Sequence, residues 1–154
     1  MNRSRLADGL IAAAIAVLAA TACFHAMDWH PSTYHASSAQ DIWFDADGRR
    51  VFWLEVDRDS SNERATLHPF QRVLSYPPVF ILRKAFGLAS ETAVHAFHAI
   101  IAGAWAAAFF LLLRRIGLFR PDALVFTGVA AVSSAGLFWL PVTESFVAGS
   151  LSMF

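Results

Sequence analysis

The sequence has little charge for its length. Of 154 residues, 56% are hydrophobic and only 16% carry a charged side chain, whereas about a quarter of the residues in a soluble domain are charged. The uncharged residues are also clustered, because no Asp, Glu, Lys or Arg occurs in Gly9–Met27, Thr92–Leu113 or Ala123–Val142. Runs of this length cross a hydrocarbon core of roughly 30 Å at about 1.5 Å per residue. The composition therefore predicts a membrane protein.

Cysteine and the common catalytic motifs are also scarce. Cys23 is the only cysteine, so no disulfide forms within the chain, and packing or a partner must hold any large loop. The sequence contains no P-loop, G-x-G-x-x-G, G-x-S-x-G or H-E-x-x-H pattern, which leaves a cytosolic nucleotide-dependent enzyme without support. No basic surface interleaved with aromatic residues indicates nucleic-acid binding.

We expect an all-α membrane protein with three transmembrane helices and the start of a fourth. The predicted spans cover residues 6–27, 92–113 and 123–140, and a further helix begins within 144–154. Ser90 is a suitable N-cap for the second span. Because the sequence ends inside the last apolar run, we expect the chain to be a fragment of a larger polytopic protein.

Basic residues outside the long polar loop 28–91 would share one side of the membrane. They are Arg3, Arg5, Arg114, Arg115 and Arg120. Loops on the cytoplasmic side of membrane proteins are enriched in Lys and Arg. We therefore expect the N-terminus and the turn 114–122 in the cytoplasm, the loop 28–91 outside, and the protein in the inner (plasma) membrane.

Residues 1–27 have an alternative interpretation as a cleaved signal peptide. Basic residues precede the apolar run, and Ala20-Thr21-Ala22 resembles a small-x-small cleavage site. The apolar run continues to Met27, beyond the length of most signal-peptide cores, which favours an uncleaved anchor. A secreted or lipid-anchored module processed near Cys23 remains the alternative.

The loop 28–91 is predicted to contain short interfacial helices. Val51 and Leu54 share one helical stripe in a segment that mixes aromatic and acidic residues, which predicts a helix on the outer leaflet. Further on, Pro77-Pro78 removes two backbone donors, so we expect two short helices around a kink. A β-strand over Val79–Leu82 is the alternative.

Five loop residues are candidates for chemistry. Asp45 and Asp47 lie two residues apart, so they could share a divalent cation such as Mg or Mn, or one could act as a general base. Arg49 and Arg50 could bind phosphate bidentately. His68 could donate a hydrogen bond to a pyrophosphate. For the two acidic residues, the competing interpretation is a solvated turn whose carboxylates form salt bridges with the arginines. For His68, it is a partly exposed histidine beside a structural proline.

Other polar residues give weaker signals. His30 and His35 are spaced too loosely for a metal-ligand pair. His95 and His98 share one helix face at i, i+3; ionisable residues in membrane segments usually face the protein interior, but these two lie near the outer end, so we expect them to reach the interface. Glu144 either joins the outer site or begins a helix.

At FDADGRRVF, SSNERATLHPFQRVLSYPP and FWLPVTESF, the chain resembles bacterial membrane glycosyltransferases of the GT-C type, relatives of protein mannosyltransferases and of aminoarabinose and oligosaccharyl transferases. The order of parts carries the resemblance: a helix, a large outer loop with an early acidic motif, a His-Pro segment, then helices with a Pro-x-Thr-Glu turn. It covers essentially the whole chain, as the N-terminal portion of such an enzyme.

The resemblance implies transfer of a sugar from a polyprenyl-phosphate donor at the extracytoplasmic face. Asp45 or Asp47 matches the first-loop acid that acts as base or helps to bind a metal, and His68 matches the His-Pro position. Many relatives have an adjacent acidic pair, whereas Ala46 intervenes here. Full members carry many more helices, which implies that catalysis needs missing C-terminal helices or a membrane partner. The alternative function is a non-enzymatic polytopic subunit or a transporter fragment.

Overall fold

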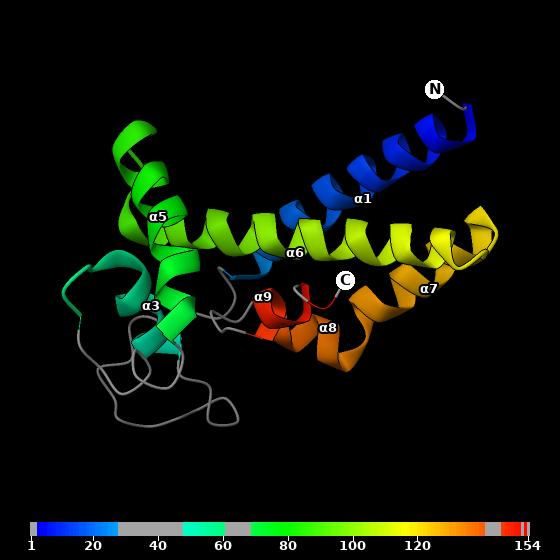
Figure 1. Ribbon diagram of the computed structural model, residues 1–154. Helices are drawn as coiled ribbons and strands as arrows, with labels where there is room; N and C mark the ends of the chain where they lie inside the picture. The colour runs from blue at the N-terminus through cyan, green and yellow to red at the C-terminus, as the bar shows by residue number, and fades with distance from the viewer. Residues whose placement is uncertain (1–2, 28–47, 61–68, 141–145, 152, 154) are drawn as a thin grey trace.

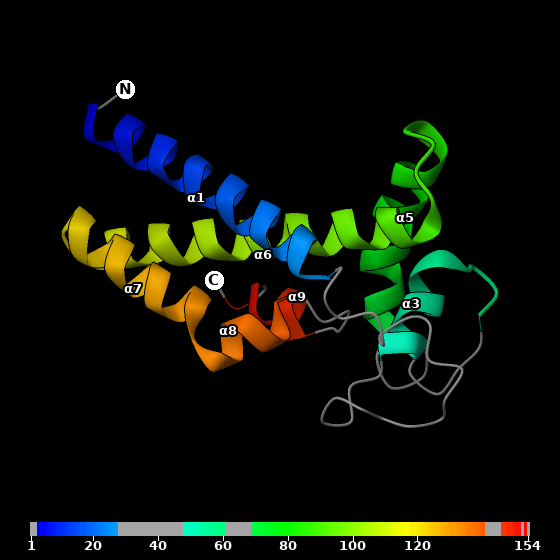
Figure 2. The same cartoon turned by 180° about the vertical axis from the view of Figure 1, so that it is seen from behind.

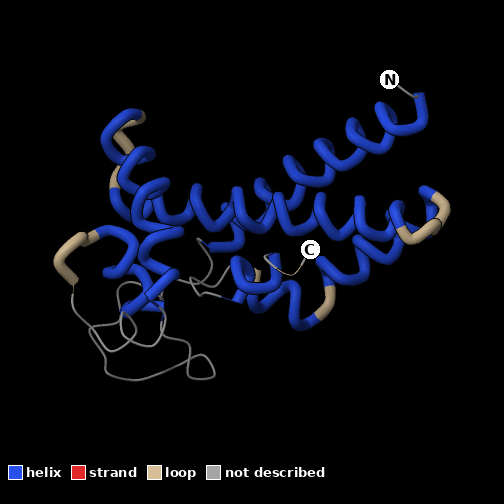
Figure 3. Tube along the Cα trace, in the orientation of Figure 1, coloured by secondary structure: helices blue, strands red, loops and turns tan. Residues whose placement is uncertain are grey.

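The computed structural model describes residues 3–27, 48–60, 69–140, 146–151 and 153 (Figure 1). All regular structure within these residues is helical (Figure 3), as the composition predicts. The helices are α1 (Arg3–Met27), α3 (Gly48–Val56), α5 (Pro69–Ala85), α6 (Ser90–Arg115), α7 (Arg120–Val132), α8 (Ser134–Trp139) and α9 (Phe146–Leu151). The strand alternative for Val79–Leu82 is wrong, because these residues lie inside α5.

The two longest helices, α1 and α6, have the length and composition of membrane spans. They correspond to the predicted spans 6–27 and 92–113, and the mean hydropathy of their most apolar windows is 2.1 and 2.0. Only 17% of that window is buried in α1 and 39% in α6. Most of this apolar surface therefore faces outward, which suits contact with lipid better than a role as the core helix of a soluble domain.

α1 and α6 pack side by side in opposite directions (Figures 1 and 2). Near their middle, a Cβ added to Gly103 of α6 would lie 2.5 Å from the carbonyl oxygen of Ala16 and 3.1 Å from the Cβ of Ala20. Small residues allow membrane helices to approach this closely. Towards the end of α1, Cys23 and Met27 are buried against Ala99 and Ala102 of α6.

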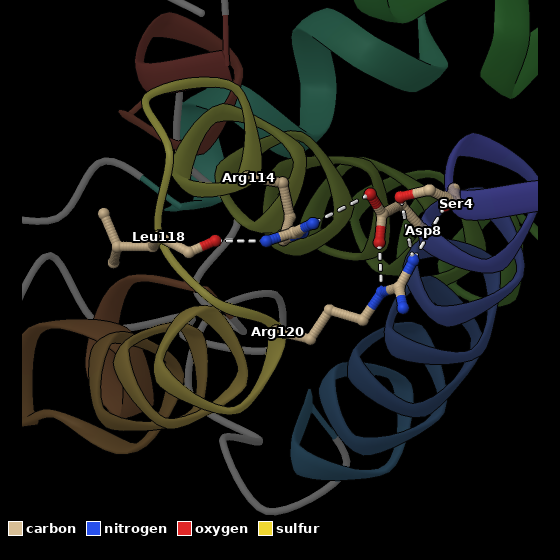
Figure 4. A network of polar contacts seen from close by, with 5 residues as sticks. All are labelled: Ser4, Asp8, Arg114, Leu118 and Arg120. Carbon is tan, nitrogen blue, oxygen red and sulfur yellow. Dashed lines mark hydrogen bonds and ion pairs between the residues drawn. The ribbon is translucent and has the colours of Figure 1, made fainter. Parts of the chain in front are cut away.

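Arginines hold the other end of this helix pair together through Asp8 (Figure 4). Arg120 Nε donates to Asp8 Oδ1 at 2.6 Å, and Arg114 Nη2 donates to Asp8 Oδ2 at 3.3 Å. Arg120 also donates to the backbone oxygen of Ser4 at 2.9 Å, and Arg114 to that of Leu118. The N-terminal turns of α1 are therefore fixed to the α6–α7 turn, at the end where the predicted cytoplasmic arginines gather.

The α6–α7 turn forms as the sequence predicts, although one helix start differs. Gly117 takes φ +102° after the end of α6, and Pro121 lies in the first turn of α7. At the start of α6, however, Ala89 occupies the N-cap and makes no side-chain cap hydrogen bond. Ser90 is instead the first helical residue, because the helix extends one residue further than expected.

The third apolar segment is not one continuous helix, so the predicted uninterrupted span over 123–140 is not observed. Ser133 lies between α7 and α8 with φ −62° and ψ 158°. Its hydroxyl donates to the backbone oxygen of Ala130 at 2.7 Å and accepts from the backbone N–H of Gly136 at 3.1 Å. One side chain therefore serves the end of one helix and the start of the next, which stabilises the break.

The two short helices predicted around Pro77-Pro78 are instead one helix, because α5 continues through both prolines. Each proline lacks the N–H that would bond to the carbonyl four residues earlier, here Val73 and Leu74. Both of those residues are exposed, so the breaks in the bonding ladder fall on the outer side of the helix. The single helix ends before Gly87, which takes φ +67°.

The predicted further helix over 144–154 is present in part as α9. It packs on the middle of α6, where Trp105 Nε1 donates to Ser150 Oγ at 2.9 Å. The ring of Trp105 stacks on Phe109 at 5.5 Å and 6° between planes. This hydrogen bond fixes the last helix to α6.

Candidate functional site

Helix α3 brings a carboxylate into the interior where α3, α5 and α6 meet. Val51, Leu54 and Glu55 lie at i, i+3 and i+4, on one face of α3, and all three are buried. Val51 and Leu54 confirm the predicted helical stripe. Their complete burial stabilises this contact by roughly 1.5–3 kcal/mol for each side chain, which draws Glu55 in beside them.

Glu55 pairs with His98 of α6. His98 Nε2 lies 3.1 Å from both carboxylate oxygens, and the two side chains are 5% and 1% exposed for His98 and Glu55 respectively. Phe97 stands edge-on to the His98 ring at 5.3 Å. A carboxylate buried this deeply needs a partner, because desolvation of an unpaired charge costs several kcal/mol. The pair therefore fixes α3 to the N-terminal part of α6.

Two arginines of α5 bind backbone carbonyls at the C-terminal end of α3, next to Glu55. Arg83 Nη1 donates to the backbone oxygen of Val56 at 2.7 Å, and Arg72 Nη2 donates to that of Asp57 at 3.2 Å. Arg72 Nη1 also reaches the backbone oxygen of Ser60 at 3.2 Å. The last carbonyls of a helix lack intrahelical partners and carry partial negative charge. Cationic donors from α5 therefore satisfy carbonyls at the C-terminal end of α3, the same end at which Glu55 pairs with His98.

An apolar cluster surrounds this junction. Val79 of α5 is buried against Ala93, Val94 and Phe97 of α6. Phe52 and Val56 of α3 pack against the same cluster. The helices of the polar loop thus rest on the first turns of α6, at the end opposite Asp8 and its arginines (Figures 1 and 2).

Of the predicted site residues, the structure describes only those on α3. Arg49 and Arg50 lie in its first turn, and Arg50 is exposed. Asp45, Asp47 and His68 lie outside the described residues. Asp47 directly precedes the first residue of α3 in the sequence, a position where Asp is favoured as an N-cap.

The expectation that His95 and His98 reach the interface is wrong. Both are buried, at 6% and 4% exposure, and the His95 ring meets Phe24 of α1 edge-on at 5.9 Å. The alternative, that intramembrane histidines face the protein interior, is the correct one. The reason is that α1 and α3 cover this face of α6, which the spacing within one helix does not reveal.

The Glu55–His98 pair was missed by sequence reasoning, although a signal for it exists. Glu55 lies at i+4 from Val51, on the same face of a helix, and a carboxylate that is buried with that face requires a buried partner. His95 and His98 are the ionisable residues inside the second predicted span. The two signals lie 43 residues apart, and only the packing of α3 on α6 joins them.

Chemically, the described part of the junction is closed. Glu55 and His98 contact each other and are shielded from solvent, so they position α3 on α6. Within the described residues, His, Cys, Asp and Glu do not gather in any group of three that could hold a metal ion.

Comparisons with protein-family models, with curated proteins and with solved structures found no match.

Proposed function

We propose that the chain is part of an integral membrane glycosyltransferase that uses a polyprenyl-phosphate-linked sugar at the extracytoplasmic face. The observation that supports it is the fixed position of α3. This helix is held by the Glu55–His98 pair and by Arg83, and it begins directly after Asp45-Ala46-Asp47. The acidic motif thus directly precedes, in the sequence, a helix that is fixed to the first turns of a candidate span, and in the proposal it meets the phosphate of a lipid-linked donor there.

The opposite ends of α6 support the proposed orientation. Arg114, Arg115 and Arg120 lie at the end that carries the N-terminus, whereas α3 and α5 pack at the other end (Figure 1). By the positive-inside tendency, the arginine end is cytoplasmic and the loop helices are outside. In this arrangement Arg49 and Arg50 serve phosphate binding, and Asp45 or Asp47 serves as base or metal ligand.

Reporter insertions test the orientation. We expect alkaline phosphatase inserted at Arg58–Asp59, an exposed turn after α3, to be active, and the same reporter inserted at Gly117 to be inactive. Green fluorescent protein at the two positions should give the reverse pattern. Activity of the phosphatase at Gly117 would contradict the orientation.

Transfer assays in native membranes test the chemistry, because any partner helices are then present. With a radiolabelled polyprenyl-phosphate sugar, Asp45→Asn or Asp47→Asn should lower transfer by about 10²–10⁴-fold if the residue acts as general base. Asp59→Asn, which changes an exposed carboxylate on the turn after α3, is the matched control. Transfer that is unchanged in both Asp45→Asn and Asp47→Asn would refute the proposal.

One observation favours the alternative of a non-enzymatic membrane subunit. The buried polar pair that links the loop to α6 is closed to solvent and stabilises the fold without contacting a substrate. A subunit of this kind would retain partner binding in both Asp variants and lose it when the surface over 70–82 is altered. The two functions are therefore separated by the same set of variants.

A further inference from the structure

Helix α5 exposes a continuous apolar stripe. Val73, Leu74, Phe80 and Ile81 are 66%, 65%, 41% and 54% exposed, and Pro77 is exposed between them. Their positions, i, i+1, i+4, i+7 and i+8, place all five on one side of a helix. Lys84, at i+11, extends the same side and is also exposed.

The opposite side of α5 is already occupied. Ser75, Val79 and Leu82 lie at i, i+4 and i+7 on that side. Ser75 is buried, with its hydroxyl bonded to the backbone oxygen of Gln71, and Val79 and Leu82 pack against the α6 cluster. The apolar stripe therefore points away from α6 and forms no part of the internal core.

The depth of α5 follows from where it packs. Val79 contacts Ala93, Val94 and Phe97, which belong to the first two turns of the candidate span in α6. α5 runs across this end of α6 in both views (Figures 1 and 2). If α6 crosses the membrane, α5 therefore lies along the membrane surface at the edge of the hydrocarbon.

We infer that the stripe of Val73, Leu74, Pro77, Phe80 and Ile81 is a lipid-contacting surface, which inserts among the acyl chains of the outer leaflet while Lys84 reaches the phosphate headgroups. An amphipathic helix at the interface buries its apolar side to about 5–10 Å, and a lysine at its end extends its charge toward the headgroups. Phe86, in the connection between α5 and α6, is also exposed, at 70%. The inference depends on the membrane placement proposed above and not on sugar transfer.

Spin-label accessibility tests it with the full chain in vesicles of phosphatidylethanolamine and phosphatidylglycerol. A Cys23→Ser background retains a hydroxyl donor for the backbone oxygen of Leu140, to which Cys23 Sγ donates at 3.2 Å. Labels are placed singly through Leu74→Cys and Ile81→Cys on the stripe, and through Arg58→Cys as a water-exposed control. Both stripe residues are exposed, so the labels leave the core intact.

We expect the stripe labels to collide readily with oxygen, which dissolves in the acyl chains. With a water-soluble nickel chelate, the stripe labels should collide several-fold less often than the Arg58→Cys label does. That pattern identifies lipid contact. Free access of the nickel chelate to both stripe labels would overturn the inference, because the stripe would then face water. Protection from both reagents, with an immobilised spectrum, would also overturn it, because protein would then cover the stripe. The phosphatase insertions report orientation separately, so the two failures are distinguishable.

Discussion

Gly103→Ala should weaken the packing of α1 on α6. The added Cβ would lie 2.5 Å from the carbonyl oxygen of Ala16, about 0.9 Å closer than the 3.4 Å at which ordinary contact begins. The obstructing atom belongs to a helix backbone and cannot rotate away. The two helices must therefore separate along their contact, which affects neighbouring pairs such as Cys23 with Ala99.

The magnitude follows from two opposing effects. Replacement of a helical glycine by alanine gains about 0.5–1 kcal/mol from backbone entropy, and overpacking a closely packed contact costs about 1–3 kcal/mol. Gly9→Ala is the matched control, because it lies in α1 with no atom within 4 Å of the added Cβ. Since the entropy gain is common to both variants, their difference of about 1–3 kcal/mol measures the contact at Gly103.

The assay is reversible unfolding by dodecyl sulfate in mixed micelles, followed by tryptophan fluorescence and far-ultraviolet circular dichroism. The free energy of unfolding should fall for Gly103→Ala and rise slightly for Gly9→Ala. Equal stability of the two variants would refute the close approach of α1 and α6 at this position, and with it the antiparallel pair on which the fold rests.

Three further predictions concern polar contacts. Glu55→Ala should lower the free energy of unfolding by about 3–5 kcal/mol, because it leaves His98 buried without its partner. In a double-mutant cycle with His98→Ala, the summed losses of the two single variants should exceed the loss of the double variant. Simple additivity would mean that the pair is not coupled. Asp8→Asn should speed amide hydrogen exchange in the first turns of α1, because Arg120 loses its carboxylate partner; unchanged exchange there would count against the Asp8 network. Ser133→Ala should cost about 0.5–2 kcal/mol in the same micelle assay, because it removes a helix cap, whereas Ser133→Thr should retain most of that stability; equal losses in both would point to sterics instead of the hydroxyl.

Much of the helical content could be predicted from local signals. The candidate spans in α1 and α6 follow from length and lack of charge, and Gly117 and Pro121 mark the turn between α6 and α7. The two errors in helix continuity have local causes that propensity does not resolve. α5 continues through Pro77-Pro78, where the affected carbonyls belong to residues on the side of the helix turned away from α6, and Ser133 breaks the third segment through two hydrogen bonds of one hydroxyl.

The candidate site was less predictable. The motif at Asp45 and Asp47 remains a sequence prediction, since it lies outside the described residues. The carboxylate that the structure places in the interior is Glu55, whose role depends on a histidine far away in the sequence. The expected exposure of His95 and His98 was wrong for the same reason: their position near a helix end is local, whereas their burial depends on which other helices cover that face.

The sequence by itself determined which segments are helical and apolar and which end of each carries the arginines, because hydrophobicity, charge and helix-breaking residues act over a few turns. Only the tertiary structure decided that Asp8 pairs with Arg114 and Arg120, that Glu55 pairs with His98, and that α5 turns an apolar stripe outward. These pairings join residues far apart in the chain. A charge is stable in the interior only where the packing of helices brings its partner within hydrogen-bonding distance.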